Sequence, residues 1–195
     1  MYPVSDGFLR AVKSNTRKYY WTGTIVTKGG MTYELGAKEI VKGSGYISRQ
    51  CCGSTEIELG TVYAAEMGIT LLSDIDRYTL EDALVTLVFH LVLADGSVED
   101  VPMGVFEVSE ANRLAKCLEL KVYDFMLRFD KSFNGFETVG TAYDFIALCC
   151  KRCKVEFANK RAEIDAMPNG GVTLSVYTEN DIETCRDVLF YVAQV

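Results

Sequence analysis

Hydrophobic and polar residues alternate in short runs up to about residue 122, which is typical of strands with one buried face. Aromatic and β-branched residues from Lys18 to Val26 predict the first strand. Gly29-Gly30 predicts a turn, after which Met31–Leu35 returns as the second arm of a hairpin.

The alternation continues through the middle of the chain. A strand is expected from about Glu66 onward, where a helix-favouring composition gives way to alternation. Asp95-Gly96 separates two β-branched runs, Ala83–Leu93 and Val98–Val108, and predicts a tight hairpin. Clean alternation over Leu114–Val122 predicts a half-buried antiparallel strand.

Helical spacing of hydrophobic residues predicts a short helix over Pro3–Val12, capped by Ser5 or Asp6. The same spacing predicts a helix from a Thr141 cap to about Cys153 and a last helix that starts at Asp181.

Strands therefore dominate the first part of the chain and helices the second, which predicts an α+β protein. We expect an antiparallel β-domain over residues 1–135, followed by a small helix-containing (α/β) subdomain over residues 136–195 that continues beyond this chain.

Composition narrows the function classes. The 195-residue chain is 49% hydrophobic, which is ample for a packed core, and its net charge of −7 argues against binding nucleic acid or anionic membranes. No run approaches the roughly 20 apolar residues of a membrane helix, and no secretion signal is visible. Seven cysteines cannot all pair within one chain, so a reduced, cytosolic protein is expected.

The cysteines are the first candidate for chemistry. Cys150 and Cys153 form a C-x-x-C pair, and with Cys51 and Cys52 they could supply four thiolates to zinc, as in a zinc-binding adaptor. Cysteines spaced along a helix face more often act as small hydrophobic core residues. Core packing is therefore the favoured interpretation, with no metal expected.

Carboxylates and the single histidine are the second candidate. An acidic cluster of Asp74 and Asp76 with Glu81 and Asp82 could serve a small metal-dependent hydrolase, but residues of this type are also ordinary turn formers. His90 lies between apolar neighbours. This context is typical of a strand histidine whose ring nitrogens are hydrogen-bonded or face solvent. No nucleotide-binding glycine motif is present, so we expect no catalytic residue, no cofactor and no enzymatic activity.

Several segments resemble, in order, the hub and tail-associated proteins of phage and prophage tails. They include an aromatic hairpin preceded by Arg17, a glycine-centred segment over Ile57–Met67, and the segments Pro102–Val108, Val122–Met126 and Arg186–Gln194. The last three match family patterns of the type Pro-Met-Gly-x-Phe, Ala-Tyr-Asp-x-Met and Arg-Asp-x-Leu. Each match is short, but together they span nearly the whole chain.

This resemblance implies a hub-type antiparallel β-barrel in a baseplate hub or tail-tip protein that forms a ring, commonly a homotrimer. It implies partners among tail tube, distal tail and tape-measure proteins, and a place in the virion tail after assembly in the bacterial cytoplasm. Tyr19, Tyr20 and Trp21 are candidate interface residues, with core packing as the alternative.

Hub proteins usually continue beyond the Arg186–Gln194 helix, whereas this sequence stops at Val195. Two explanations stay open: the sequence is the N-terminal region of a longer protein, or the protein is unusually short.

Overall fold

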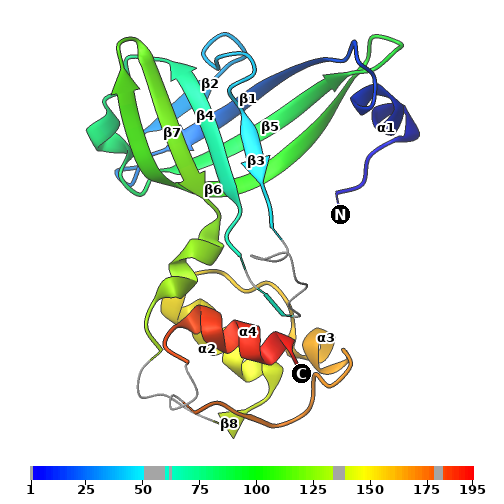
Figure 1. Cartoon of the computed structure of the whole chain (residues 1–195), viewed down its shortest axis with the longest axis vertical. Coiled ribbons are helices and arrows are strands. Elements are labelled where there is room, and N and C mark those ends of the chain that lie inside the picture. The colour runs from blue at the N-terminus through cyan, green and yellow to red at the C-terminus, as the bar shows by residue number, and fades with distance from the viewer. Residues whose placement is uncertain (1, 51–59, 62, 134–138, 178–181) are drawn as a thin grey trace. The chain divides into compact units, whose positions relative to one another are not determined.

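The computed structural model of the chain describes residues 2–50, 60–61, 63–133, 139–177 and 182–195 (Figure 1). Contacts within the chain define two compact units. The sheet unit comprises Met1–Ser48 and Ala65–Asp124, and the helical unit comprises Arg49–Ala64 and Phe125–Val195. The predicted domain division at residue 135 stays a prediction, because a unit defined by contacts is not by itself an independently folding domain.

The N-terminal helix and the first hairpin are confirmed. Helix α1 (Asp6–Val12) begins after Ser5, whose Oγ accepts a hydrogen bond from the Phe8 N–H at 3.0 Å. Strand β1 (Lys18–Val26) then pairs in antiparallel fashion with β2 (Thr32–Leu35) across the predicted glycine turn.

All pairings within the seven-stranded sheet are antiparallel, and the strand order is β2-β1-β5-β6-β7-β4-β3. The remaining strands are β3 (Tyr46–Ser48), β4 (Glu66–Leu72), β5 (Leu84–Val92), β6 (Val98–Leu114) and β7 (Cys117–Tyr123), with a 3-10 turn, η1 (Arg77–Leu80), before β5. The predicted Asp95-Gly96 hairpin joins β5 to β6, and the strand expected from about Glu66 is β4.

Strand β6 bends the sheet because its two halves pair with different neighbours. Residues Val98–Glu107 pair with β5, whereas Glu107–Leu114 pair with β7. Register shifts lie near the bend, between Thr86 and Val88 in β5 and after Val108 in β6, and such bulges sharpen strand curvature. The sheet can therefore curl around one core, as Figure 1 shows for β4 to β7. This core contains Ile25, Leu35, Met67, Ile69, Leu71, Val85, Leu87, Phe106, Val108, Leu118, Leu120 and Val122.

The predicted antiparallel sheet is confirmed, but within the described residues no ladder joins β2 to β3 or β4 to close it into a barrel. The chain after β2 instead makes an isolated bridge between Ile40 and Leu71 of β4, and the Val41 N–H donates to the Thr70 carbonyl at 2.9 Å.

The described part of the helical unit contains three α-helices around a small core. Its elements are η2 (Phe125–Asp130), β8 (Val139–Gly140), α2 (Ala142–Cys153), α3 (Arg161–Asp165), β9 (Leu174–Ser175) and α4 (Cys185–Ala193). The predicted Thr141 cap of α2 is confirmed, and Asp144 completes a capping box with it. Helix α4 starts later than predicted, because Thr184 and Asp187 form the capping box that fixes its first turn.

The main core cluster of the helical unit comes mostly from its loops and from the inner faces of α2 and α4. It contains Phe129, Phe133, Phe145, Cys149, Cys150, Cys153, Leu174, Val176, Ile182, Cys185 and Val188. Cysteines thus supply four of the positions that packing requires.

Candidate functional site

Strand β1 lies inside the sheet along only half of its length. Its C-terminal half, Gly23–Val26, pairs with β2 on one side and with β5 on the other. Its N-terminal half, Lys18–Thr22, pairs with β5 alone, and no further strand pairs with it among the described residues. This stretch, called the β1 edge below, includes all three residues predicted to form an interface.

The direction of the free backbone groups follows from the register. The Thr27 N–H donates to the Met31 carbonyl at 2.8 Å, which makes this the first hydrogen-bonded pair of the β1–β2 hairpin. Because backbone groups of a strand point to alternate sides, odd-numbered residues of β1 face the β2 side and even-numbered ones face β5. The N–H and C=O groups of Tyr19 and Trp21 therefore point away from the sheet, along the β1 edge.

Ring contacts hold the side chains of this edge in place. The Phe89 ring of β5 lies 5.5 Å from the Tyr19 ring and 5.0 Å from the Trp21 ring, and Phe8 of α1 packs edge-on at 6.3 Å. On the opposite face of the sheet, Tyr20 is 38% exposed and stacks on His90 with ring centres 4.5 Å apart. The three predicted interface residues thus line one edge, but a role in binding stays a prediction.

His90 is a satisfied strand histidine, as predicted. Its Nδ1 lies 2.6 Å from Asp100 Oδ1 on β6, and its Nε2 lies 2.7 Å from Thr22 Oγ1 on β1. A tautomer with the proton on Nδ1 donates to the carboxylate and accepts from the hydroxyl. The imidazole therefore links three neighbouring strands beside the β1 edge.

The order hydroxyl, imidazole and carboxylate is also that of a hydrolytic triad. A triad needs backbone N–H groups beside the nucleophile to stabilise an oxyanion. The N–H of Thr22 points into the β1–β5 ladder by the same alternation, so it is not available for this task. We therefore assign the Thr22–His90–Asp100 contacts to holding strands together.

The acidic cluster is not assembled into a site. Asp76 caps η1 by accepting from the Tyr78 N–H at 3.1 Å, and Asp82 forms an ion pair with Lys28 at 2.7 Å. Asp74 and Glu81 are exposed on the same connection. Asp76 and Asp82 thus have separate structural contacts, and the structure gives the alternative metal-dependent hydrolase no assembled site among its described residues.

The alternative zinc site has two of its four cysteines within the described residues. Cys150 and Cys153 lie in α2 and are buried in the core of the helical unit, as favoured above, whereas Cys51 and Cys52 lie outside the described residues. In the part of the chain that the structure describes, no three His, Cys, Asp or Glu side chains are placed to hold a metal ion. Cys185 of α4 joins the α2 cysteines, which the C-x-x-C spacing did not indicate.

A second polar group covers the outer face of the sheet. Tyr46 of β3 lies directly over Gly68 of β4, where a Cβ atom would collide with the tyrosine ring. Glu66 accepts hydrogen bonds from Tyr46 at 2.7 Å and from Tyr123 at 2.9 Å, and these bonds lower the pKa of its carboxyl. Lys121 lies 3.4 Å from the same carboxylate. These contacts stabilise the pairing of short β3 with β4.

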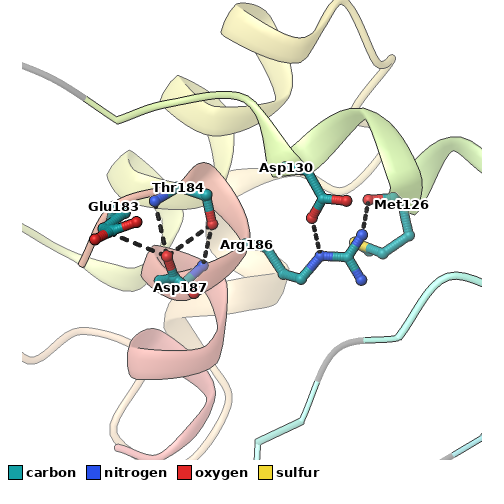
Figure 2. Close-up of polar contacts among 6 residues, drawn as sticks. All are labelled: Met126, Asp130, Glu183, Thr184, Arg186 and Asp187. Carbon is teal, nitrogen blue, oxygen red and sulfur yellow. Dashed lines mark hydrogen bonds and ion pairs between the residues drawn. The ribbon is translucent and has the colours of Figure 1, made fainter. Parts of the chain in front are cut away.

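The Arg-Asp pair of the C-terminal resemblance segment has a structural role, which Figure 2 shows. Arg186 Nε donates to Asp130 at 2.6 Å, and its terminal NH2 group donates to the Met126 carbonyl at 3.0 Å. Asp187 accepts from the backbone N–H groups of Thr184 at 2.7 Å and of Glu183 at 3.1 Å. This clamp fixes η2 against α4 within the helical unit.

Sequence reasoning did not identify the partners of His90. The observed hairpin is centred on Asp95, so His90 faces Asp100, whereas a two-residue turn at Asp95-Gly96 would have placed His90 opposite Val101. The Thr22 contact depended on the β1–β5 pairing, which no local pattern specified.

No helix within the described ranges is both long and apolar enough to cross a membrane.

Comparison with known proteins gives only distant structural similarity. The chain matches no family model and no curated protein. One similar structure is a chain of the virion of a native gene transfer agent particle, with 12% identity, a TM-score of 0.42, and coverage of 68% of this chain and 49% of that chain. Another belongs to a Francisella PdpA–VgrG complex in a half-lidded state, with 11% identity, a TM-score of 0.47, and coverage of 96% of this chain and 30% of that chain. The chain therefore spans about half or less of the length of either structure.

Proposed function

We propose that this chain is a structural component of a phage or prophage tail, namely a baseplate hub or tail-tip protein. In this proposal, copies of the chain form a ring, a homotrimer in the assembled particle. The ring docks to tail tube, distal tail and tape-measure proteins. The protein is made in the bacterial cytoplasm and ends in the virion tail.

The ordered resemblance segments support this proposal through the roles that they have in the fold. Pro102–Val108 lies in β6 around the bend of the sheet, and Val122–Met126 spans the end of β7 and the start of η2. Arg186–Gln194 covers α4 from its second residue to its C-cap, and the first turn of α4 carries the clamp in Figure 2. These residues pack, turn or cap, as expected of a protein whose function is assembly.

The β1 edge is the observation that carries the proposal. The N–H and C=O groups of Tyr19 and Trp21, which no described strand pairs with, can pair with a strand of another chain, since an exposed sheet edge is a template for strand addition. Phe89 packs against both side chains, so the edge is held in place before a partner arrives. A pre-ordered edge loses less conformational entropy on binding than a mobile one.

The edge also fits a ring. An isologous contact of two identical β1 edges gives a closed dimer, whereas a contact between β1 and a different surface repeats around an axis. The outer edges of β2 and β3 end the sheet and offer such a different surface. Head-to-tail pairing of β1 with one of them can therefore close a trimer.

Light scattering over a concentration series tests this proposal, with two substitutions at one position. Tyr19→Pro removes an outward-pointing N–H, whereas Tyr19→Ala removes the ring and keeps the N–H. We expect the wild type to approach the mass of a trimer as concentration rises. The alanine variant should still associate, and the proline variant should stay monomeric.

Tyr20→Pro is the control for general damage, because the Tyr20 N–H points into the β1–β5 ladder and its loss should disturb the sheet itself. Trp21, the only tryptophan of the chain, reports by its fluorescence whether β1 remains folded. A wild type that is monomeric at every concentration, or a folded Tyr19→Pro variant that associates as well as the wild type, contradicts the proposal.

A further inference from the structure

The end of α2 carries a hollow with a basic lining, called the basic hollow below. Among the described residues, its lining consists of Lys131, Leu148, Lys151 and Arg152, and its volume is about 410 Å³. None of these residues is acidic, so the hollow presents positive charge around one aliphatic side chain. Pockets of roughly 300–1,000 Å³ hold whole small molecules, so this hollow has room for a single large side chain.

Part of this positive charge serves the end of α2 itself, since the dipole of a helix stabilises cations near its C-terminus. Lys131 Nζ donates to the Arg152 carbonyl at 3.2 Å, which holds Lys131 beside the hollow. Lys151 differs, because within the described ranges its ammonium makes no hydrogen bond or ion pair. Its side chain is exposed and is therefore available to a partner.

A projecting aromatic side chain lies on the sheet unit, in η1. Tyr78 is 75% exposed, the largest exposed fraction among the large hydrophobic side chains that the structure describes. Arg77 holds its ring in place, because the guanidinium lies 4.7 Å from the ring centre and donates to the hydroxyl at 2.7 Å. Asp76 caps the turn by accepting from the Tyr78 N–H, and Leu80 anchors the turn in the core. The side chain of Tyr78, called the Tyr78 knob below, is therefore presented by an ordered turn.

The charges around the Tyr78 knob are mostly negative. Three exposed carboxylates flank it in sequence, namely Asp74, Asp76 and Glu81. Arg77 is the one positive residue among them, so residues 74–81 have a net charge of −2. The Asp74 carboxylate makes no hydrogen bond or ion pair within the part of the chain that the structure describes. An aromatic ring among carboxylates on one surface thus complements an aliphatic side chain among cations on the other.

We infer that the Tyr78 knob of one copy docks in the basic hollow of a second copy. The ring packs against Leu148, and the flanking carboxylates face Lys131 and Lys151. This inference deepens the proposed function and rests on it, because it names a contact between copies in addition to the β1 edge. The contact joins two different surfaces, so it is head-to-tail and can repeat around a ring. Tyrosine is a common anchor of protein interfaces, and opposite charges around an anchor favour the correct partner.

Charge reversal tests the inference, with light scattering used to find the concentration at which half of the chains are associated. Lys151→Glu places like charges in the contact and should raise this concentration about tenfold. Asp74→Lys should do the same for the same reason. The double variant that combines both changes restores an opposite pair, so it should associate more tightly than either single variant.

Tyr78→Ala removes the anchor and should also raise the concentration of half-association about tenfold. Raising the salt concentration from about 0.05 M to about 0.5 M should weaken association of the wild type more than that of Lys151→Glu, because salt screens exposed charges. The substituted residues are all exposed, so the variants should fold, and Trp21 fluorescence with circular dichroism checks this.

Lys13→Glu is the matched control for the change in net charge. Lys13 is an exposed lysine at the C-cap of α1 and belongs to neither surface, so its reversal should leave association unchanged. If the wild type associates and a folded Lys151→Glu or Tyr78→Ala variant associates equally well, the inference is overturned while the proposed ring stands. A wild type that stays monomeric at every concentration overturns both.

Discussion

The sheet unit and the helical unit are held together in different ways. The core of the sheet unit comes almost entirely from aliphatic side chains that alternate along strands, and its polar contacts, such as those of His90, lie on the outer face. The core of the helical unit contains four cysteines and three phenylalanines, and a clamp of charged side chains orders its C-terminal helix. Local alternation therefore specifies the first unit, whereas long-range polar contacts complete the second.

The largest expected effect comes from a cavity in the core of the sheet unit. Leu118 of β7 is fully buried, so Leu118→Ala should lower the free energy of unfolding by about 3 kcal/mol. Leu114 lies on the paired strand β6 and is 70% exposed, and Leu114→Ala should cost less than about 0.5 kcal/mol. Urea unfolding followed by Trp21 fluorescence measures both, because the single tryptophan lies in this unit. Equal losses in the two variants would contradict the assigned core.

The next largest loss of stability is expected when the Arg186 clamp of the helical unit is removed. Arg186→Ala removes the hydrogen bonds to Asp130 and to the Met126 carbonyl, and should cost about 1–2 kcal/mol because Asp130 is half exposed. Arg186→Lys keeps the charge but loses the planar fork, so it should recover only part of this loss. The helical circular dichroism signal should melt earlier in urea, while the Trp21 transition moves much less. If Arg186→Ala moved only the urea transition seen by Trp21 fluorescence, the clamp could not be stabilising the helical unit.

The contact between Thr22 and His90 should contribute about as much to the free energy of unfolding as a single hydrogen bond. Thr22→Val removes the hydroxyl that contacts His90, at a cost of about 1 kcal/mol in the free energy of unfolding. Thr24→Val is the matched control, because Thr24 lies on the same strand and the same face and makes no contact with the imidazole. An equal response of the two variants in the Trp21 urea transition would argue against a role of His90 in joining strands.

The smallest effect concerns acid pH and the helical unit. Hydrogen bonds, first from Arg161 and then from Thr141, lower the pKa of Asp144 to about 2. Because the folded pKa lies below the ordinary value near 4, this contribution is present above about pH 4 and is lost as pH falls toward 2. The carboxyl is 39% exposed, so solvent screening limits the loss to below about 1 kcal/mol. Asp144→Asn should remove this acid-dependent part when urea unfolding of the helical signal is repeated at pH 5 and pH 2.5, whereas an unchanged pH dependence would exclude Asp144 as its source.

The same comparison explains how much could be predicted from sequence. Hairpins with a glycine turn bring neighbouring strands together, so β1, β2 and β5 were predicted close to their observed bounds. Strand β6 was predicted to end at Val108 and runs on to Leu114, where it pairs with β7. Closure of the predicted barrel could not be judged from the sequence, because it depends on whether the distant ends β2 and β3 pair, and no local pattern encodes this. The late start of α4 reflects competition between two polar starts, Asp181 and Thr184, which the Asp187 side chain decides.

The residues of the candidate site could likewise be predicted from local patterns, but their long-range neighbours could not. Tyr19, Tyr20 and Trp21 could be selected as aromatic strand residues, but the free edge exists only because β2 ends opposite Gly23. The packing of α4 on α2 brings Cys185 into the same core as Cys153 across more than thirty residues of sequence, and no local pattern specified this. The C-x-x-C spacing identified two cysteines of that core, whereas Cys51 and Cys52, the other residues of the zinc alternative, lie outside the described residues.

The most direct test of the central claim, assembly through the β1 edge, is amide hydrogen exchange at low and at high protein concentration. The amides of Tyr20 and Thr22 point into the β1–β5 ladder and should be protected at both concentrations. The amides of Tyr19 and Trp21 should exchange fast in dilute protein and become protected as the protein associates. Association without any added protection of these two amides would contradict assembly through this edge.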